Sequence, residues 1–329
     1  MSTCFKCGRE SGREVVLNAH GESYILTLCD ECYKKYEPKV TRKGIEWREI
    51  KRFRFSYGVL FIESSKLGEL ISKASANIGW IASKISVFGI ILSIVSTVFM
   101  IYSLANRLIK YNPIVIHLLK HRVGLMIPGV DPMLPLIEGL IALLLATIIH
   151  EFMHGVVSTY YGIPPSSAGV ALFLGFLPFM AYVKPPGMHR DPWKNVKIAG
   201  AGIVGNAILA LICLALFFLN APRIYFEKPM LVFAPPPLLK LAGIMEIELP
   251  FTASLPYYIW FVNFAVILIN GCMLFPAVDG HIILKYMLLK KIGYKYSWAV
   301  TLFSMLVFAV LLTWAVMIDW FHLFTSNFV

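Results

Sequence analysis

Long apolar stretches recur along most of the chain and constrain its fold more than any other feature. Each can cross the hydrocarbon core of a bilayer, which takes about 20 apolar residues in a helix. Only 15% of the 329 residues are charged, against roughly 25% in soluble proteins. A soluble globular domain, a disordered chain and a small disulfide scaffold are therefore excluded. The predicted spans are residues 79–104, 134–158, 197–220, 256–289 with an interruption at 276–280, and 297–322.

A further apolar stretch at residues 165–185 is too short for a sixth span, and Gly175 and Pro178 interrupt it. We predict a re-entrant, strand-like segment whose two ends lie on one side of the membrane. The predicted fold class is an α-helical polytopic membrane protein with about five transmembrane helices, this re-entrant β segment and a small N-terminal metal domain.

Positive charge predicts the orientation in the membrane. The net charge is +11, and Lys and Arg gather before the first, third and fifth spans, which lie on one side if there are five spans. Cytoplasmic loops carry this excess, so we expect that side to be the cytoplasm. The first 25 residues are polar and contain no cleavable signal peptide, so the N-terminal domain is also expected in the cytoplasm. No motif for nucleic-acid binding is present, and no nucleic-acid partner is expected.

The N-terminal cysteines have the spacing of a zinc site. Cys4 and Cys7 form one Cys-x-x-Cys pair, and Cys29 and Cys32 form another after a spacer of 21 residues. Two such pairs can place four sulfurs around one tetrahedral ion. A disulfide pairing would need an oxidising compartment, against which the basic flank argues. We predict a structural zinc in a zinc ribbon or treble clef, with short strands at 15–17 and 24–26.

The predicted domains follow from these features. Residues 1–37 form the zinc-ribbon-like domain, residues 38–78 a basic juxtamembrane connector, and residues 79–329 the transmembrane domain. Whether the zinc domain binds a partner, senses metal or only caps the terminus is left open.

The second span ends in His150-Glu151-Phe152-Met153-His154. A helix places residues i and i+4 on one face, so both imidazoles can reach one metal, with Glu151 beside them as the base for a water molecule. An ionisable residue at mid-bilayer costs roughly 2.5–3.5 kcal/mol on insertion scales. Three such residues in five positions therefore point to function. The alternative is a helix end where polar residues meet water.

Two histidines leave a catalytic zinc one protein ligand short. Among the acidic residues after His154, only Asp279 lies in a break within an apolar helix, between Pro276 and Gly280. Irregular backbone at membrane depth is tolerated where it lines a cavity. We predict Asp279 as the third ligand, and His281 is the second choice.

These motifs together resemble those of the site-2 protease family of intramembrane zinc metalloproteases, in particular its archaeal members. The resemblance covers residues 128–290 and does not reach the cysteines. Besides the histidine motif and Asp279-Gly280, three further segments resemble the family: residues 128–139 before the metal helix, Gly175–Val183 as its re-entrant β segment, and Ala199–Asn206 as its Ala-Gly-Pro-x-x-Asn helix without the Pro.

The resemblance implies a three-helix core, formed here by spans two to four. It implies that His150, His154 and Asp279 bind a catalytic zinc and that Glu151 activates water. The implied activity is that of a zinc metalloendopeptidase, which cleaves transmembrane segments of membrane-anchored substrates in regulated intramembrane proteolysis. The partners would be a transmembrane protein substrate and the lipid bilayer of a prokaryotic cell membrane, with the active site opening to the cytoplasm.

Candidate substrate-binding residues are Asn270, Gly175 and Pro178. The family often has the pattern Asn-x-x-Pro-x-x-x-Leu-Asp-Gly, but here Asn270 lies nine positions before Asp279 rather than eight, and Val278 replaces Leu. The strand-like segment at 169–183 is a candidate to hold an unwound substrate by β-addition.

Three rival functions remain. A zinc transporter would need a second ligand cluster along its path, for which only Asp279 and His281 are candidates. Another type of membrane zinc protease takes its third ligand soon after the histidine motif, yet no acid occurs between His154 and Asp191. An inactive scaffold would not need Glu151. The sequence leaves the substrate, the activating signal and the oligomeric state open.

Overall fold

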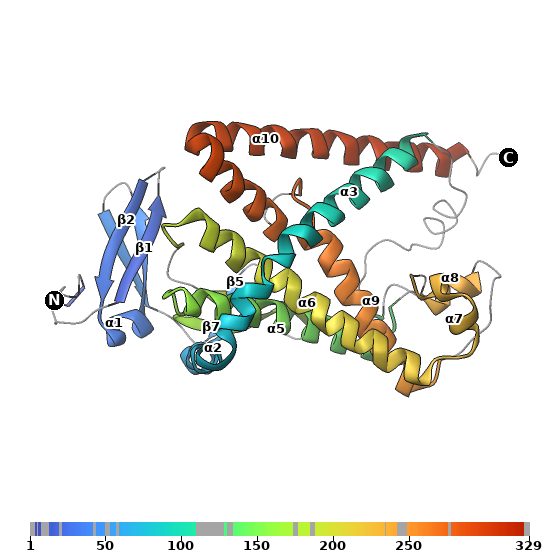
Figure 1. Ribbon diagram of the computed structural model, residues 1–329, viewed down its shortest axis with the longest axis horizontal. Helices are drawn as coiled ribbons and strands as arrows, with labels where there is room; N and C mark the ends of the chain where they lie inside the picture. The colour runs from blue at the N-terminus through green and yellow to red at the C-terminus, as the bar shows by residue number, and fades with distance from the viewer. Residues whose placement is uncertain are drawn as a thin grey trace. The chain divides into compact units, whose positions relative to one another are not determined.

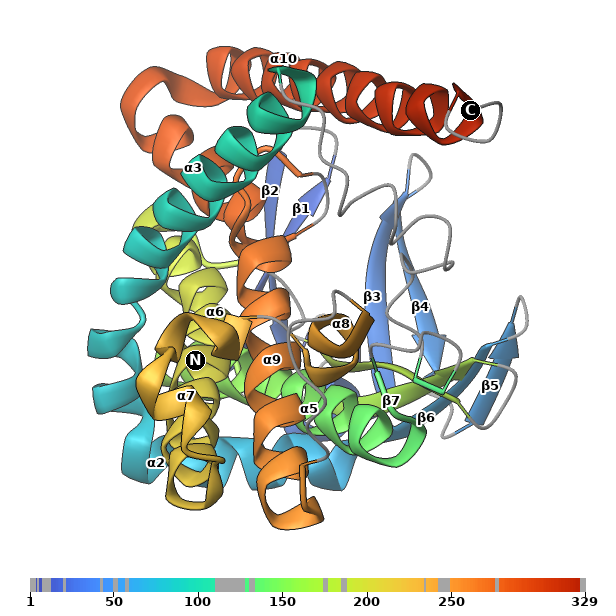
Figure 2. The ribbon, with the colours of Figure 1, turned by 90° about the vertical axis from the view of Figure 1, so that its right-hand side faces the viewer.

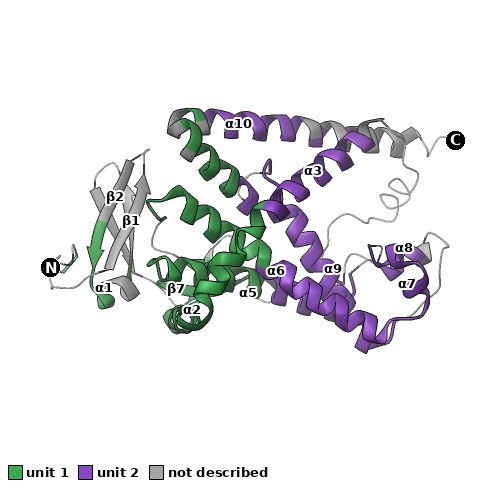
Figure 3. Cartoon of the chain, in the orientation of Figure 1, with its two compact units in different colours: residues 1–90, 147–204, 282–298 green, residues 91–146, 205–281, 299–329 purple. Residues whose placement is uncertain are grey.

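The structure, a computed structural model, is mostly helical (Figure 1). The chain divides into two compact units (Figure 3): unit 1 holds residues 1–90, 147–204 and 282–298, and unit 2 holds the others. The residues that the structure describes are 4, 6–7, 13–19, 22–41, 44–49, 53–56, 59–109, 128–129, 134–173, 177–184, 188–233, 235–241, 249–275 and 278–325.

The N-terminal region of unit 1 consists of two antiparallel hairpins around one short helix. Strand β1 (Arg13–Ala19) pairs with β2 (Glu22–Leu28), helix α1 (Asp30–Lys35) follows, and β3 (Tyr36–Thr41) pairs with β4 (Gly44–Glu49). The first hairpin confirms the two predicted strands. The second hairpin was not predicted, and it begins in the zinc-ribbon segment and continues into the predicted connector.

A four-stranded antiparallel sheet forms the other β structure of unit 1. Its order is β5 (Phe53–Ser56), β6 (Val59–Ser64), β7 (Ser167–Phe173) and β8 (Leu177–Lys184); Figure 2 shows the first three side by side. Strands β7 and β8 confirm the predicted strand-like segment. Strands β5 and β6 come from the predicted connector, so that segment is a structural part of the sheet.

Helices α2 (Ser65–Ile85) and α3 (Phe88–Ile109) divide the first predicted span. The apolar helix that is long enough to cross a membrane is Phe88–Asn106 and does not begin at residue 79. Ser86 is the C-cap of α2; its N–H bonds to the Ala82 carbonyl and its Oγ donates to the Ser83 carbonyl. The turn also fits Gly89 closely against Gly200 of α6, where a Cβ would clash with backbone.

Three further helices are long and apolar enough to cross a membrane: α5 (Leu136–Tyr160), α6 (Pro192–Asn220) and α9 (Phe251–Gly271). Together with α3 they give four such helices in the described part of the chain and confirm a polytopic membrane fold. Three short helices connect α6 to α9: α7 (Ile224–Glu227), the 3-10 helix η1 (Pro229–Phe233) and α8 (Pro236–Leu241).

The end of the fourth predicted span and the fifth one form a single helix, α10 (Asp279–Thr325). It contains a shorter apolar stretch, Ala299–Val310. The lysines near residues 290–295 interrupt the apolar pattern and so predict two separate segments, but they do not break the helix.

Each unit has a buried interior of its own. In unit 1 the core joins α2, α5, β7 and α6 through Ile71, Ala82, Met153, Val156, Val157, Ala168 and Ala201. In unit 2, Asn206 of α6 donates to the Ala146 carbonyl (3.2 Å) and to Asn263 Oδ1 of α9 (2.9 Å). Such buried amide bonds link membrane helices where apolar contacts give little specificity.

Candidate metal centres

The C-terminal part of α5 brings three potential ligands together in unit 1. The ligand atoms of His150, Glu151 and His154 all lie within 4.8 Å of one another, and the two Nε2 atoms are 3.0 Å apart. Two nitrogens bound to one tetrahedral zinc at about 2.0–2.1 Å would be roughly 3.4 Å apart. The histidine pair therefore fits a single ion after a shift of a few tenths of an ångström.

The second ring nitrogen of His154 is fixed by α6. His154 Nδ1 lies 2.7 Å from the Ile198 carbonyl, and because a carbonyl only accepts, Nδ1 carries the proton. His154 Nε2 then carries a lone pair, which is the form of the ring that binds a metal. This is the usual arrangement of metal-binding histidines, in which a bond to the other nitrogen sets the tautomer and the ring orientation.

Gly202 of α6 provides the space in which the histidines meet. A Cβ at this position would lie 2.5 Å from His154 Nε2 and 2.8 Å from His150 Cε1. Only a residue without a side chain allows α6 to approach these edges of the two rings. This role of Gly202 was not predicted, although the Ala199–Gly202 run of small residues indicates close helix packing.

Glu151 is held by the sheet. Its Oε2 accepts a hydrogen bond of 3.0 Å from the Val183 N–H of β8. Val183 follows Tyr182, whose hydroxyl donates to Glu63 Oε2 of β6 at 3.4 Å, and Glu63 also accepts from Ser167 Oγ. The tyrosine reaches across Gly169, where a Cβ would lie 2.9 Å from its hydroxyl. This chain of contacts was not predicted from the sequence, because it depends on the register of three strands.

The predicted third ligand lies in unit 2. Asp279 is the first residue of α10 and is partly buried, and His281 lies in the same turn. Gly280 approaches the Gly271 carbonyl so closely that a Cβ would clash with it, so the start of α10 lies against the end of α9, where Asn270 is located. The roles of Asp279 and Asn270 stay predictions.

The two other predicted substrate-binding residues belong to the β7–β8 hairpin. Pro178 is in β8 opposite Leu172, next to an irregularity in the register. Gly175 lies outside the described residues, and so does the side chain of Pro178.

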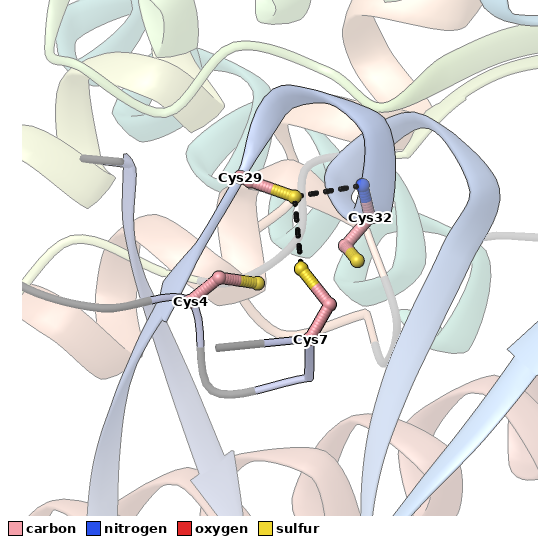
Figure 4. A group of neighbouring side chains, drawn as sticks. All are labelled: Cys4, Cys7, Cys29 and Cys32. Atoms are coloured by element: carbon pink, nitrogen blue, oxygen red, sulfur yellow. Dashed lines mark hydrogen bonds between the residues drawn. The ribbon is translucent and has the colours of Figure 1, made fainter. Parts of the chain in front are cut away.

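The four N-terminal cysteines form the second ligand group (Figure 4). Their sulfurs all lie within 4.8 Å of one another, with Cys7 Sγ 3.5 Å from Cys29 Sγ. The N–H of Cys32 donates to Cys29 Sγ at 3.4 Å, where α1 begins. Sulfurs bound to one tetrahedral zinc at about 2.3 Å would be roughly 3.8 Å apart, so this group also fits a single ion.

The thiols of this group interact strongly. Burial acts to raise the pKa of the Cys4 thiol, but backbone hydrogen bonds with Cys29, Cys7 and Lys6 lower it to about 6. Burial and the neighbouring thiols raise the pKa of Cys32 to about 12. Four such close groups cannot all ionise unless a cation compensates their charge, and a divalent metal would supply that charge.

Comparison with known proteins adds two matches. The model of a family described as Peptidase family M50 matches residues 138–328, more than half of the chain. An uncharacterized protein of Methanocaldococcus jannaschii is 39% identical over 80 residues, which are 24% of this chain and 22% of that protein. No solved structure gives a significant match.

Proposed function

Because the chain belongs to peptidase family M50, we propose that it is an intramembrane zinc metalloprotease that hydrolyses peptide bonds in transmembrane segments of membrane-anchored substrates. The family as such consists of membrane metalloproteases. The observation that carries the proposal is the grouping of His150, Glu151 and His154 on an apolar helix, with two ring nitrogens 3.0 Å apart.

Each residue of the group has a chemical role. His150 and His154 would hold the zinc, and Asp279 is proposed as the third protein ligand. Zinc, when bound, supplies a Lewis acid that lowers the pKa of water toward about 7 and polarises the scissile carbonyl. Glu151 takes a proton from the attacking water and passes it to the leaving amine. The hydrogen bond from the Val183 N–H orients the Glu151 carboxylate for this proton transfer.

The substrate segment must unwind before it can be cut, because the carbonyls of a transmembrane helix already accept hydrogen bonds. Among the described strands β8 is at the edge of its sheet, and it carries the amide that binds Glu151. An extended substrate that adds to this edge would therefore pass close to the catalytic base. We propose that β8, with Pro178, and the hairpin residue Gly175 hold the unwound substrate, together with Asn270.

We propose that the four N-terminal cysteines hold a second, structural zinc. A domain this small has little apolar core, so metal binding would supply much of its folding free energy. Four apolar helices and the family support a multi-pass membrane protein. The excess of basic residues supports a cytoplasmic location of the zinc domain and of the active-site opening. The resemblance to archaeal members of the family supports a prokaryotic cell membrane.

The test measures zinc content together with cleavage of a transmembrane reporter that carries helix-destabilising residues. It uses the Cys4→Ser/Cys7→Ser background, so that only the histidine site binds metal. Glu151→Gln should keep this zinc and reduce cleavage about 10²–10⁴-fold, the usual contribution of a general base. Asp279→Ala should lose both zinc and cleavage.

Glu227→Ala is the matched control, because this exposed acid pairs only with Arg223 in the described contacts and should keep both zinc and cleavage. If the unaltered chain binds zinc in proteoliposomes and transports it without cutting any reporter, the transporter replaces the protease. If Asp279→Ala keeps its zinc, Asp279 is not the third ligand.

A further inference from the structure

Helix α2 has three distinct faces, all within unit 1. Its small residues Gly68, Ser75 and Gly79 are buried against the end of α5 and the loop that follows it. Ser75 Oγ donates to the Val156 carbonyl at 2.8 Å, and Ser83 Oγ lies 2.6 Å from the Tyr161 hydroxyl. One face of α2 therefore packs against the helix that carries the histidine motif and the loop that follows that helix.

A second face of α2 is apolar and exposed. Leu67, Leu70, Ile78 and Ile81 recur at helical spacing and expose 44%, 59%, 40% and 50% of their surface. Soluble proteins seldom expose four large aliphatic side chains next to one another. Yet α2 is not among the described helices apolar enough to cross a membrane.

The third face of α2 is basic and carries a tryptophan. Lys66, Lys73 and Lys84 are exposed, and Glu69 is the single acid of the helix. Lys84 Nζ lies 4.0 Å from the centre of the Trp80 ring. Lysine and tryptophan beside an apolar stripe are typical of helices that lie in the headgroup region of a bilayer.

The position of α2 agrees with a membrane surface. It ends at Ile85, and the apolar helix that can cross the membrane starts at Phe88, so the end of α2 must lie at the edge of the bilayer. Figure 1 shows α2 nearly end-on, whereas the unit 1 part of α6 lies lengthwise in that view. Helix α2 therefore crosses this part of a spanning helix and does not run parallel to it.

We infer that α2 is an interfacial helix that binds the anionic surface of one leaflet. Its aliphatic stripe enters the upper acyl region, and Lys66, Lys73 and Lys84 bind phosphate-containing anionic headgroups. The charge favours this occupant over a protein partner, because three exposed lysines and one acid border the stripe. The helix thereby holds the histidine-bearing end of α5 at a fixed depth below the headgroups.

The first experiment measures the depth of Trp80 in vesicles of phosphatidylcholine and phosphatidylglycerol. The full chain and its Trp80→Phe variant are reconstituted with lipids brominated either near the headgroup or near the chain end. The difference between the two proteins reports Trp80 alone. Shallow bromines should quench this difference signal more strongly than deep ones. Quenching by aqueous iodide with none by either lipid would overturn the inference.

The second experiment measures the preference of the protein for spin-labelled phosphatidylglycerol over phosphatidylcholine. Replacing all three lysines by Gln should reduce this preference, by up to roughly fivefold per lysine at low salt. The triple Lys→Arg variant keeps the charge and should keep the preference. If the Gln variant binds both lipids as the unaltered chain does, the lysines do not bind headgroups. Neither experiment needs protease activity, so a failure of the proposed function leaves both readouts intact.

Discussion

The two ligand groups of this chain differ in how they are assembled. The cysteine group takes all four ligands from two short motifs with an intervening hairpin, and its surroundings are local in sequence. The histidine group takes two rings and a carboxylate from a single helical turn and depends on distant elements for orientation: Ile198 and Gly202 of α6, and Val183 of β8. A closed four-ligand group suits a structural metal, whereas two histidines and a held base suit a catalytic one.

The two groups are therefore vulnerable to different substitutions. The cysteine group should fail only when its own ligands change. The histidine group should also fail when residues far away in the sequence move, because they set the tautomer, the available space and the position of the base.

The largest expected effect comes from removing cysteine ligands. Cys4→Ser/Cys7→Ser should abolish metal binding by the N-terminal region, where a structural zinc contributes about 10–16 kcal/mol, and make that region sensitive to limited proteolysis. The histidine metal and reporter cleavage should persist. The control is Cys213→Ala/Cys272→Ala, which replaces a buried cysteine of α6 and the buried cysteine that follows α9, and it should keep both metals. Loss of cleavage in the serine variant would show that the two groups are not independent.

Gly202→Ala should have the next largest effect. The new methyl group would displace the facing edges of His150 and His154, and metal affinity should fall about 100-fold, the upper range for disturbed ligand surroundings. Gly200→Ala is the matched control, because its methyl would meet the Ser86 carbonyl and not the histidines. Metal analysis of both variants decides the point: equal zinc losses would mean that α6 packing, not space at the rings, controls the site.

The sequence predicted the parts of both groups that lie in local motifs. The Cys-x-x-Cys pairs and the histidines at i and i+4 each lie within about one turn of the chain. Both motifs can therefore be recognised without knowledge of the fold. The strands at β7 and β8 were also predictable, since Gly175 and Pro178 exclude a continuous helix. The polytopic class followed from the apolar stretches alone.

What the sequence did not predict depends on contacts between distant segments. Residues 79–104 are mostly apolar apart from Lys84 and scattered Ser and Thr residues, so hydropathy alone placed them in one span. The break at Ser86 lies where α2 packs on α5 and Gly89 on Gly200. Strands β5 and β6 lie in a basic segment and were not predicted. Strand β7, which pairs with β6, lies about a hundred residues later. The binding of Glu151 by Val183 requires the sheet register, which no periodicity reveals.

Metal binding by the cysteine group should depend on pH. At pH 7 the metal-free cysteine group keeps a proton on Cys32, whose pKa is raised to about 12, while Cys4, with a pKa of about 6, is mostly ionised. Zinc must displace the Cys32 proton, so affinity should rise with pH, by up to about tenfold per unit for each proton released. Chelator competition in a His150→Ala/His154→Ala variant isolates this group. An affinity that does not change between pH 7 and 8 would contradict the prediction.

The smallest effect is expected from Tyr182, which supports the proposed base Glu151 only through the next residue, Val183. Tyr182→Phe removes the hydroxyl that reaches Glu63 across Gly169, and a bond of this kind contributes about 1 kcal/mol, equivalent to roughly fivefold. Because the next residue, Val183, holds Glu151, the loss should appear in kcat for reporter cleavage, with zinc content unchanged. Tyr160→Phe, at an exposed position of α5, should change neither. If Tyr182→Phe instead lowers zinc content as Gly202→Ala does, the sheet supports the metal ligands themselves, and the separation between base support and ligand support would have to be abandoned.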